Sequence, residues 1–239
     1  MTEQTQITSL SVFRFAGPGA RLWAFSQMLL ARPAMARLPD VGFWKLFGSG
    51  TGEGFTPVPN TAVYGILATW PNLGSARTGV EAPIFERYRA NSKEDWTVML
   101  RTTAVRGRWD GRAPFVGSGK SSGPLAALTR ATLRPRTMLK FWQRVPSISA
   151  AIGSDTNVAF KIGLGEVPWL HQVTFSIWPD TNSMADFARR DGPHARAIRA
   201  VREGEWFAEE LYARFDIVGS SGSWNGADPL QTFERPEPA

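Results

Sequence analysis

The sequence predicts an α+β fold made of two halves with the same order of elements, and three observations support this prediction. Eight short segments have the alternation or the β-branched and aromatic composition of strands. Gly and Pro residues separate these segments from stretches with helical spacing. A segment rich in Gly, Ser and Pro, residues 113–124, divides the chain near its middle.

The first half is predicted to follow the order β-α-β-β-α-β. Apolar and polar residues alternate at 7–15, which predicts a strand, and a turn at 17–19 leads into a helical stretch at 20–31 that ends before Pro33. A Gly-rich segment at 48–54 is expected to be a loop between strands. The remaining expected elements are strands at 41–47, 61–70 and 96–105 and a helix at 82–91.

The same order recurs after residue 124. A strand-like segment at 125–133 precedes a helical stretch at 136–151 that is interrupted near Pro146. A second, longer helical stretch follows at 182–202. The other expected elements of this half are strands at 157–164, 169–178 and 213–219.

A short match between the halves is the strongest sign of duplication. Trp70–Pro71 and Trp178–Pro179 each end a predicted strand, 108 residues apart, and precede Asn72 and Asp180, which are residue types that cap helices. Two such ferredoxin-like units whose sheets close together would form an α+β barrel. We therefore expect a first unit at 7–112, a linker at 113–124, a second unit at 125–224 and a C-terminal tail at 225–239.

Composition removes several chemistries. The 239-residue chain contains no cysteine, which excludes a thiolate haem ligand, a protein-held iron–sulfur cluster and covalent haem attachment through cysteine. Its formal net charge is +6, and 22 of its 27 basic residues are arginines, which suits carboxylate, phosphate or acidic protein partners. The polar start and the lack of an apolar segment of roughly 20 residues predict a cytoplasmic protein without a transmembrane segment.

Two Gly-rich segments invite nucleotide-binding interpretations that fail in detail. The segment at 117–121 ends like a phosphate-binding loop, but Pro114 stands where that motif needs glycine. In the segment at 48–54, Glu53 replaces the third glycine of a dinucleotide fingerprint, so we interpret it as a loop and a weak candidate lid. No nucleic-acid-binding motif is found, so we expect no nucleic-acid partner.

The chain has only two histidines, and their surroundings differ. His171 shares a strand face with Val173 and Phe175, as a buried, hydrogen-bonded strand histidine would. His194 follows Pro193 and shares a predicted helix face with apolar residues, with several arginines nearby. An apolar-facing histidine flanked by arginines is what a b-type haem pocket needs, although an ordinary core histidine explains the same pattern. A non-haem iron site using both histidines and one carboxylate is the chemical alternative.

Four stretches, at 13–15, 42–55, 174–179 and 192–204, resemble one known family. They are similar to the spheroidene monooxygenases, the carotenoid ketolases of purple phototrophic bacteria, and the similarity runs from about Leu10 to Trp224. The resemblance implies a monooxygenase that binds haem b without a covalent link and uses O₂ and electrons from reduced ferredoxin. Two hydroxylations at C-2 of spheroidene or hydroxyspheroidene would give a geminal diol, which loses water to leave the ketone.

His194 lies within one of these stretches, so the resemblance makes it the expected axial haem ligand, with His171 as the alternative. Arg190 and Arg196 are the candidates for binding the haem propionates. Candidates for an apolar wall are Trp70, Phe175 and Trp178. The expected partners are a carotenoid, a ferredoxin, the surface of the intracytoplasmic membrane and a second copy of the chain.

Other function classes remain open at this point. The same fold could serve a non-catalytic haem or carotenoid carrier, which would bind pigment without consuming reductant. A cofactor-free monooxygenase would be active without any metal. Turnover, O₂ consumption and the colour of the purified protein separate these alternatives from a haem-dependent ketolase.

Overall fold

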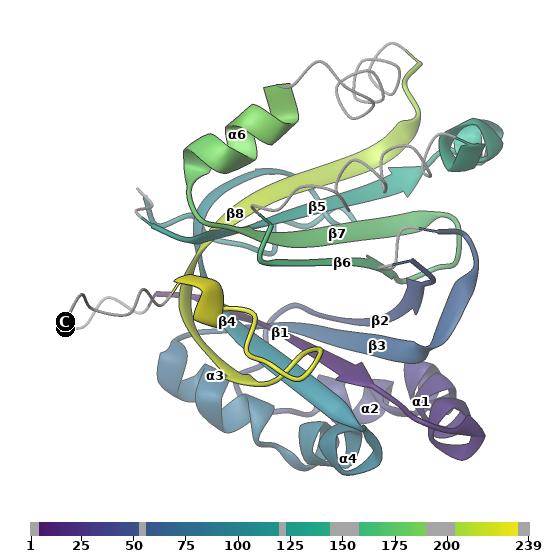
Figure 1. Ribbon diagram of the computed structural model, residues 1–239, viewed down its shortest axis with the longest axis vertical. Helices are drawn as coiled ribbons and strands as arrows, with labels where there is room; N and C mark the ends of the chain where they lie inside the picture. The colour runs from purple at the N-terminus through teal and green to yellow at the C-terminus, as the bar shows by residue number, and fades with distance from the viewer. Residues whose placement is uncertain (1–4, 53–55, 120–122, 144–157, 190–203, 234–239) are drawn as a thin grey trace.

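Eight antiparallel strands close into one barrel in the computed structural model, which describes residues 5–52, 56–119, 123–143, 158–189 and 204–233 (Figure 1). The hydrogen-bonded order around the barrel is β1-β3-β2-β6-β7-β5-β8-β4. The strands are β1 (Ile7–Arg14), β2 (Trp44–Gly50), β3 (Pro59–Trp70), β4 (Glu94–Gly107), β5 (Leu125–Leu133), β6 (Phe160–Gly165), β7 (His171–Trp178) and β8 (Phe207–Gly222). The α+β barrel predicted from the sequence is confirmed.

Helices cover the outside of the barrel (Figure 1). They are α1 (Pro18–Leu30), α2 (Arg32–Ala36), α3 (Leu73–Val80), α4 (Pro83–Asn91) and α6 (Thr181–Arg189), with 3₁₀ turns η1 (Pro135–Thr137) and η2 (Gln231–Phe233). A further helical segment occupies residues 138–143. Among the described residues, no helix is both long enough and apolar enough to cross a membrane.

The two halves of the barrel use the same internal strand order and meet at two unequal seams. The first half runs β4-β1-β3-β2 and the second β8-β5-β7-β6. Along the β4–β8 seam, eleven residue pairs are in register, from Trp96–Gly222 to Gly107–Leu211. The β2–β6 seam has only two, Gly48–Gly165 and Ser49–Leu164. The barrel is therefore held far less extensively at the β2–β6 seam.

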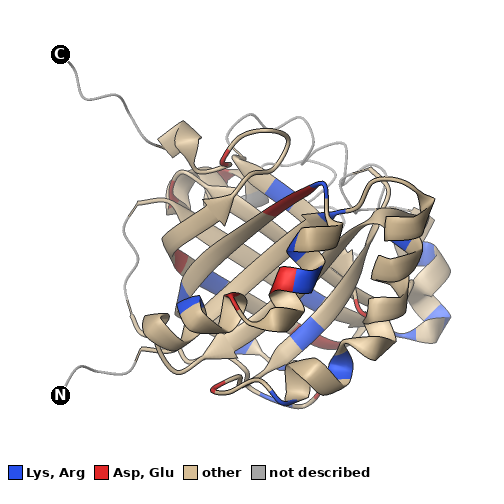
Figure 2. Cartoon of the chain, turned by 90° about the horizontal axis from the view of Figure 1, so that it is seen from below, with Lys and Arg blue, Asp and Glu red and all other residues tan. Residues whose placement is uncertain are grey.

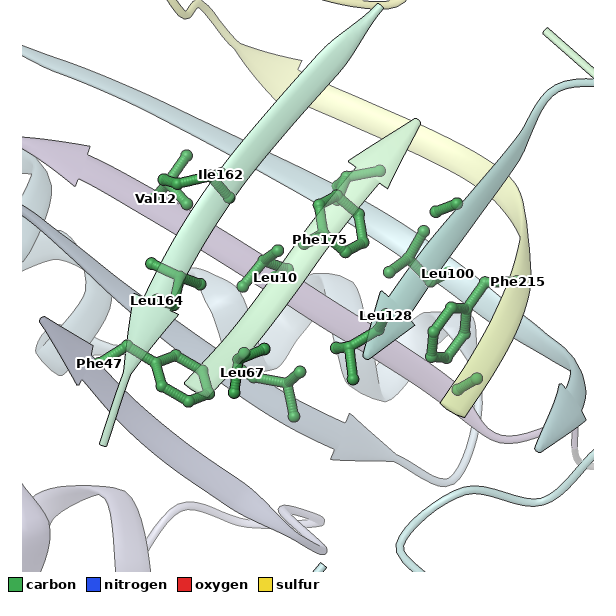
Figure 3. Close-up of a cluster of buried hydrophobic side chains, with 14 of the residues drawn as sticks. Leu10, Val12, Phe47, Leu67, Leu100, Leu128, Ile162, Leu164, Phe175 and Phe215 are labelled. Carbon is green, nitrogen blue, oxygen red and sulfur yellow. The ribbon is translucent and has the colours of Figure 1, made fainter. Parts of the chain in front are cut away.

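Alternate residues of every strand fill the barrel interior (Figure 3). Leu10 and Val12 of β1 point inward, as do Phe175 and Ile177 of β7. The intervening residues of the first half pack outward against α1–α4 in a second apolar cluster that contains Phe13, Tyr64 and Trp70, among others. Each fully buried Leu or Phe in these clusters contributes roughly 1.5–3 kcal/mol of transfer free energy.

The repeated strand ends have the predicted capping role. Trp70 and Trp178 are the last residues of β3 and β7. The Asn72 side chain accepts a hydrogen bond from the Ser75 backbone N–H at 2.8 Å and caps α3. Asp180 accepts from the Ser183 backbone N–H at 2.7 Å at the start of α6, which satisfies a free N–H group of the first turn.

Several predicted boundaries need correction. Gly48 and Gly50 belong to β2, because their backbones pair with β3 across a register shift rather than forming a loop. The helix α3 was not predicted, because its small and polar residues give little apolar periodicity. The last strand is longer than 213–219, because its residues 207–216 pair with β5 and its residues 211–222 pair with β4. Parts of the predicted helices at 136–151 and 182–202 lie outside the described residues.

Candidate functional site

One end of the barrel interior is charged rather than apolar. Arg130 lies two residues beyond Leu128 on β5, so strand alternation points its side chain into the interior, where it is fully buried. The same two-residue step from an inward apolar residue leads to Lys45, Glu166, His171 and Glu209. Charged residues thus lie on the barrel strands as well as on the outer helices (Figure 2).

Arg130 and Lys45 are bridged by carboxylates from three segments. Arg130 pairs with Glu209, and its Nη2 lies 3.0 Å from Asp110 Oδ1. Lys45 pairs with Asp110, and its Nζ lies 2.5 Å from Glu166 Oε2. The network pairs both cations with carboxylates within the barrel, which matters because an unpaired buried charge is strongly destabilising. Arg130 Nε is buried without a hydrogen-bond partner among the described residues and lies 3.9 Å from Glu166 Oε1.

A tight turn after β4 closes this end of the barrel. Asp110 and Gly111 both have positive φ, 51° and 71°, and their backbone N–H groups donate to the two oxygens of Glu209 at 2.8 and 2.7 Å. Trp109, fully buried, donates from Nε1 to Glu166 Oε1 at 2.7 Å. Its ring also lies 5.7 Å from the Arg130 guanidinium carbon, within the range of cation–π attraction.

These contacts keep the carboxylates of Asp110 and Glu209 ionised. Burial by itself would raise the pKa of Asp110, but its hydrogen bond and charge interaction with Lys45, together with Arg130, lower that pKa below its usual value. Burial likewise opposes ionisation of Glu209, but the hydrogen bonds from Gly111 and Asp110 and the charge of Arg130 lower its pKa. Both groups therefore hold their negative charge at neutral pH.

His171 stands beside this network at the start of β7. It is half-buried, and its Nδ1 is buried without a hydrogen-bond partner among the described residues. The expectation of a buried, hydrogen-bonded strand histidine is therefore wrong in both respects, because the ring lies at the barrel end, where β7 begins. Burial lowers the pKa of His171, Glu166 opposes that shift and Arg130 adds to it, so the imidazole is neutral at pH 7.

An apolar cavity of about 310 Å³ opens beside the charged network. Its walls come from α1, the β2–β3 hairpin, the 138–143 helix and the turn between β6 and β7. Phe25, Leu164 and Trp169 are among its apolar lining residues. Glu166 also lines it, so this carboxylate connects the cavity with the charged network.

Trp169 holds one wall of the cavity in place. Its φ of 69° is uncommon for a bulky residue. Its Nε1 donates to the Pro57 carbonyl oxygen at 2.8 Å, and its own carbonyl oxygen accepts from Trp142 Nε1 at 3.1 Å. The hairpin, the β6–β7 turn and the 138–143 helix are thereby tied together around the opening.

The sequence-predicted site residues have different outcomes. His194, Arg190 and Arg196 lie outside the described residues. The three candidates for an apolar wall do not share one: Phe175 lies in the barrel interior, whereas Trp70 and Trp178 belong to two separate clusters outside it. Alternation explains this correction, because inward and outward positions of a strand never share a face.

The described residues contain no group of three or more His, Asp or Glu placed to hold a metal ion. The alternative iron site needs His194 and therefore cannot be built from them. Sequence reasoning missed the charged network altogether. Part of its signal was available, because Lys45 stands two residues from Phe43 and Phe47 and Glu209 stands two residues from Phe207 and Leu211.

The fold and the site define the class of protein: an α+β barrel whose interior is charged at one end, beside an apolar cavity. Comparison with known proteins then identifies the family. No protein-family model matches the chain. It is 50% identical to the spheroidene monooxygenase of Cereibacter sphaeroides over 244 residues, covering 98% of this chain and 75% of that protein. It is 49% identical to that of Rhodobacter capsulatus, covering 94% and 95%, and 33% identical to that of Rubrivivax gelatinosus, covering 87% and 81%.

The chain belongs to the spheroidene monooxygenase family. Among solved structures, an aldoxime dehydratase in complex with butyraldoxime superposes with a TM-score of 0.61, covering 91% of this chain and 81% of that one at 9% identity. That likeness concerns the fold alone. The identities to the three spheroidene monooxygenases confirm the family resemblance seen in the sequence.

The buried network predicts a large difference between two arginine substitutions. Arg130→Ala should lower the free energy of unfolding by about 3 kcal/mol or more, because it leaves inward carboxylates without their cation. Arg89→Ala is the control, because Arg89 pairs at 2.9 Å with Glu81, whose side chain is 67% exposed; it should cost about 1 kcal/mol or less. Urea unfolding measures both, and equal losses would contradict the role of Arg130.

The lowered pKa of Glu209 predicts an acid-sensitive contribution to stability. Because its folded pKa lies below the usual 4.5, the unfolded chain binds more protons near that pH, so stability falls as the pH falls. Wild type should exceed Glu209→Gln in unfolding free energy at pH 6, and the two should converge as the pH drops through the folded pKa. Urea unfolding across this range tests it, and a pH-independent difference would refute it.

Proposed function

We propose that the chain is a carotenoid monooxygenase that oxidises C-2 of spheroidene and hydroxyspheroidene to the ketone. The observation that carries this proposal is the identity of 50% and 49% to two spheroidene monooxygenases over nearly the whole chain. The apolar cavity supports it, because a polyene end needs an apolar enclosure. Two successive hydroxylations at one carbon, each inserting one oxygen atom from O₂, give the geminal diol that loses water.

Each hydroxylation also needs two electrons and two protons, so that the second oxygen atom leaves as water. A chain without cysteine holds no cysteine-ligated iron–sulfur cluster and draws its electrons from a donor outside the chain. We propose reduced ferredoxin as the donor. The net charge of +6 supports this choice, because an arginine-rich surface favours encounter with an acidic partner.

The residues around the cavity have separable tasks in this proposal. Apolar side chains such as Phe25 and Leu164 would enclose the polyene end and exclude water. Glu166 is the ionisable group at the inner wall, and Trp109 and Lys45 hold both of its oxygens in place. A fixed carboxylate at this position would orient the water and protons that the reaction consumes and releases.

Haem b remains the proposed cofactor, and when bound it would supply the activation of O₂. The place of His171 gives no support to it as the ligand, because it does not line the cavity and its ring faces charged groups. His194 is therefore the proposed axial ligand, with Arg190 and Arg196 proposed to bind the propionates. Support for these three roles comes from the sequence pattern around residues 190–202.

We also infer that the barrel consists of two ferredoxin-like units. The support is the shared strand order of the two halves, in which the first strand lies between the third and the fourth. The equivalent helix caps at Asn72 and Asp180 are a second observation in support of this inference. In this interpretation a single chain contains the two sheets that close the barrel.

A size series at Gly48 tests whether the cavity holds the substrate. A Cβ atom added to Gly48 would meet no atom within 4 Å, and the residue lines the cavity. Gly48→Ala should keep ketolase activity, whereas Gly48→Phe should lose about tenfold or more, because the ring occupies space the polyene needs. Ketocarotenoid formation with reduced ferredoxin measures both. Full activity of Gly48→Phe would show that the substrate binds elsewhere.

An absorption spectrum tests the cofactor. Purified wild type reconstituted with haem should show a stoichiometric Soret band that shifts with dithionite and CO. His194→Ala should lose this band and the activity, whereas His171→Ala should keep the band. Haem retention in His194→Ala would overturn the ligand assignment. Iron without a Soret band would favour the non-haem site, and activity without metal would favour a cofactor-free oxygenase.

A further inference from the structure

Exposed apolar side chains are concentrated on the segments that form the walls of the cavity. Ten large apolar residues are exposed in the described part of the chain, and eight of them lie on the segments that form the cavity walls. These eight, here called the apolar face, are Leu22, Phe25, Leu29, Leu30, Val58, Leu139, Val167 and Trp169. Single exposed apolar residues need no explanation, but a group of this size on one face marks an interaction surface.

The helix α1 contributes half of the apolar face through its spacing. Leu22, Phe25 and Leu29 follow one another at intervals of three and four residues, which places them on one side of the helix. Ala24 and Gln27 are buried against the barrel. The helix therefore presents apolar residues to the outside, at the same end of the barrel as the β2–β3 hairpin and the β6–β7 turn (Figure 1).

Two of the segments that carry the apolar face contain only basic charges, whereas the β6–β7 turn carries Glu166, which pairs with Lys45. Residues 16–39, which include α1 and α2, contain three arginines, all exposed, and no Asp or Glu. Residues 134–143 contain two arginines and one lysine, and again no acidic residue. Apolar residues flanked by arginine and lysine complement the acyl chains and the anionic headgroups of a bilayer. Trp169, half exposed, is a residue type enriched at that boundary.

We propose that the apolar face docks on the surface of a bilayer that contains anionic lipid. Docking would bring the cavity mouth to the acyl chains, so that an apolar substrate enters without crossing water. The exposed residues alone support the membrane contact, whereas the nature of the substrate rests on the proposed function. Self-association through this face is disfavoured, because a twofold contact would bring its arginines together without acidic partners.

Vesicle co-sedimentation tests the docking. Wild type should bind phosphatidylcholine vesicles containing phosphatidylglycerol, and binding should weaken at high salt. Leu22→Asp/Leu29→Asp, at two residues of the apolar face that do not line the cavity, should reduce the partition coefficient by about tenfold or more, because two apolar side chains no longer enter the bilayer. Val116→Asp is the matched control: Val116 is 64% exposed, close to the 70% of Leu22 and the 71% of Leu29, but it lies outside the face. Circular dichroism verifies that all three proteins fold.

Absence of wild-type binding, or equal binding by the double variant, would overturn the proposal. Wild-type dimers that dissociate in the double variant, seen by sedimentation velocity without vesicle binding, would assign the face to a second copy of the chain and overturn it as well. Ketolase assays separate this proposal from the proposed function. The double variant should lose turnover of vesicle-embedded carotenoid but keep turnover of carotenoid in detergent micelles. Failure of wild type in both assays would refute the proposed function while the vesicle result stands.

Discussion

Closure of eight strands into a single barrel is the constraint on which the rest of this structure depends. In a closed sheet each residue points either into the interior or toward the outer layer, and a one-residue shift would exchange the two sets. Leu10, Leu128 and Phe175, far apart in the chain, thereby meet in one core. The same rule delivers Arg130 and Lys45 into the interior once the apolar positions of their strands are set.

Burying charges at one end of the barrel costs stability but fixes how the surrounding segments are arranged. A cation as deeply buried as Arg130 is costly unless carboxylates and hydrogen bonds surround it. Glu209 meets this need twice, because it pairs with Arg130 and also accepts the backbone N–H groups of the turn at Asp110 and Gly111. The turn, the strand β8 and the strand β5 are thus positioned by one carboxylate. Such a network specifies a unique arrangement where an apolar plug would not.

The two seams of the barrel have different roles: one joins the two halves, and the cavity lies at the other. The long β4–β8 seam joins the halves by eleven residue pairs with two register shifts, whereas the β2–β6 seam pairs only at Gly48–Gly165 and Ser49–Leu164. The cavity lies at the short seam, where Gly48 and Gly165 both line it and a Cβ atom at Gly48 would meet no atom within 4 Å. Glu166 follows directly after this pairing and reaches the charged network from the cavity wall. The proposed substrate site, the carboxylate and the apolar face therefore occupy one end of the molecule.

The sequence by itself determined the eight strands in their order, the barrel class and the family. Strand alternation, Gly and Pro breaks and the caps at Asn72 and Asp180 are local signals, so they can be recognised without tertiary structure. It also singled out His194, which lies outside the described residues, and it missed the helix α3, whose small residues carry little periodicity. The candidate site was decided only by the tertiary structure. Which inward charges meet, as Lys45 and Glu166 do across 121 residues, depends on the strand order around the barrel, and no local pattern encodes that order.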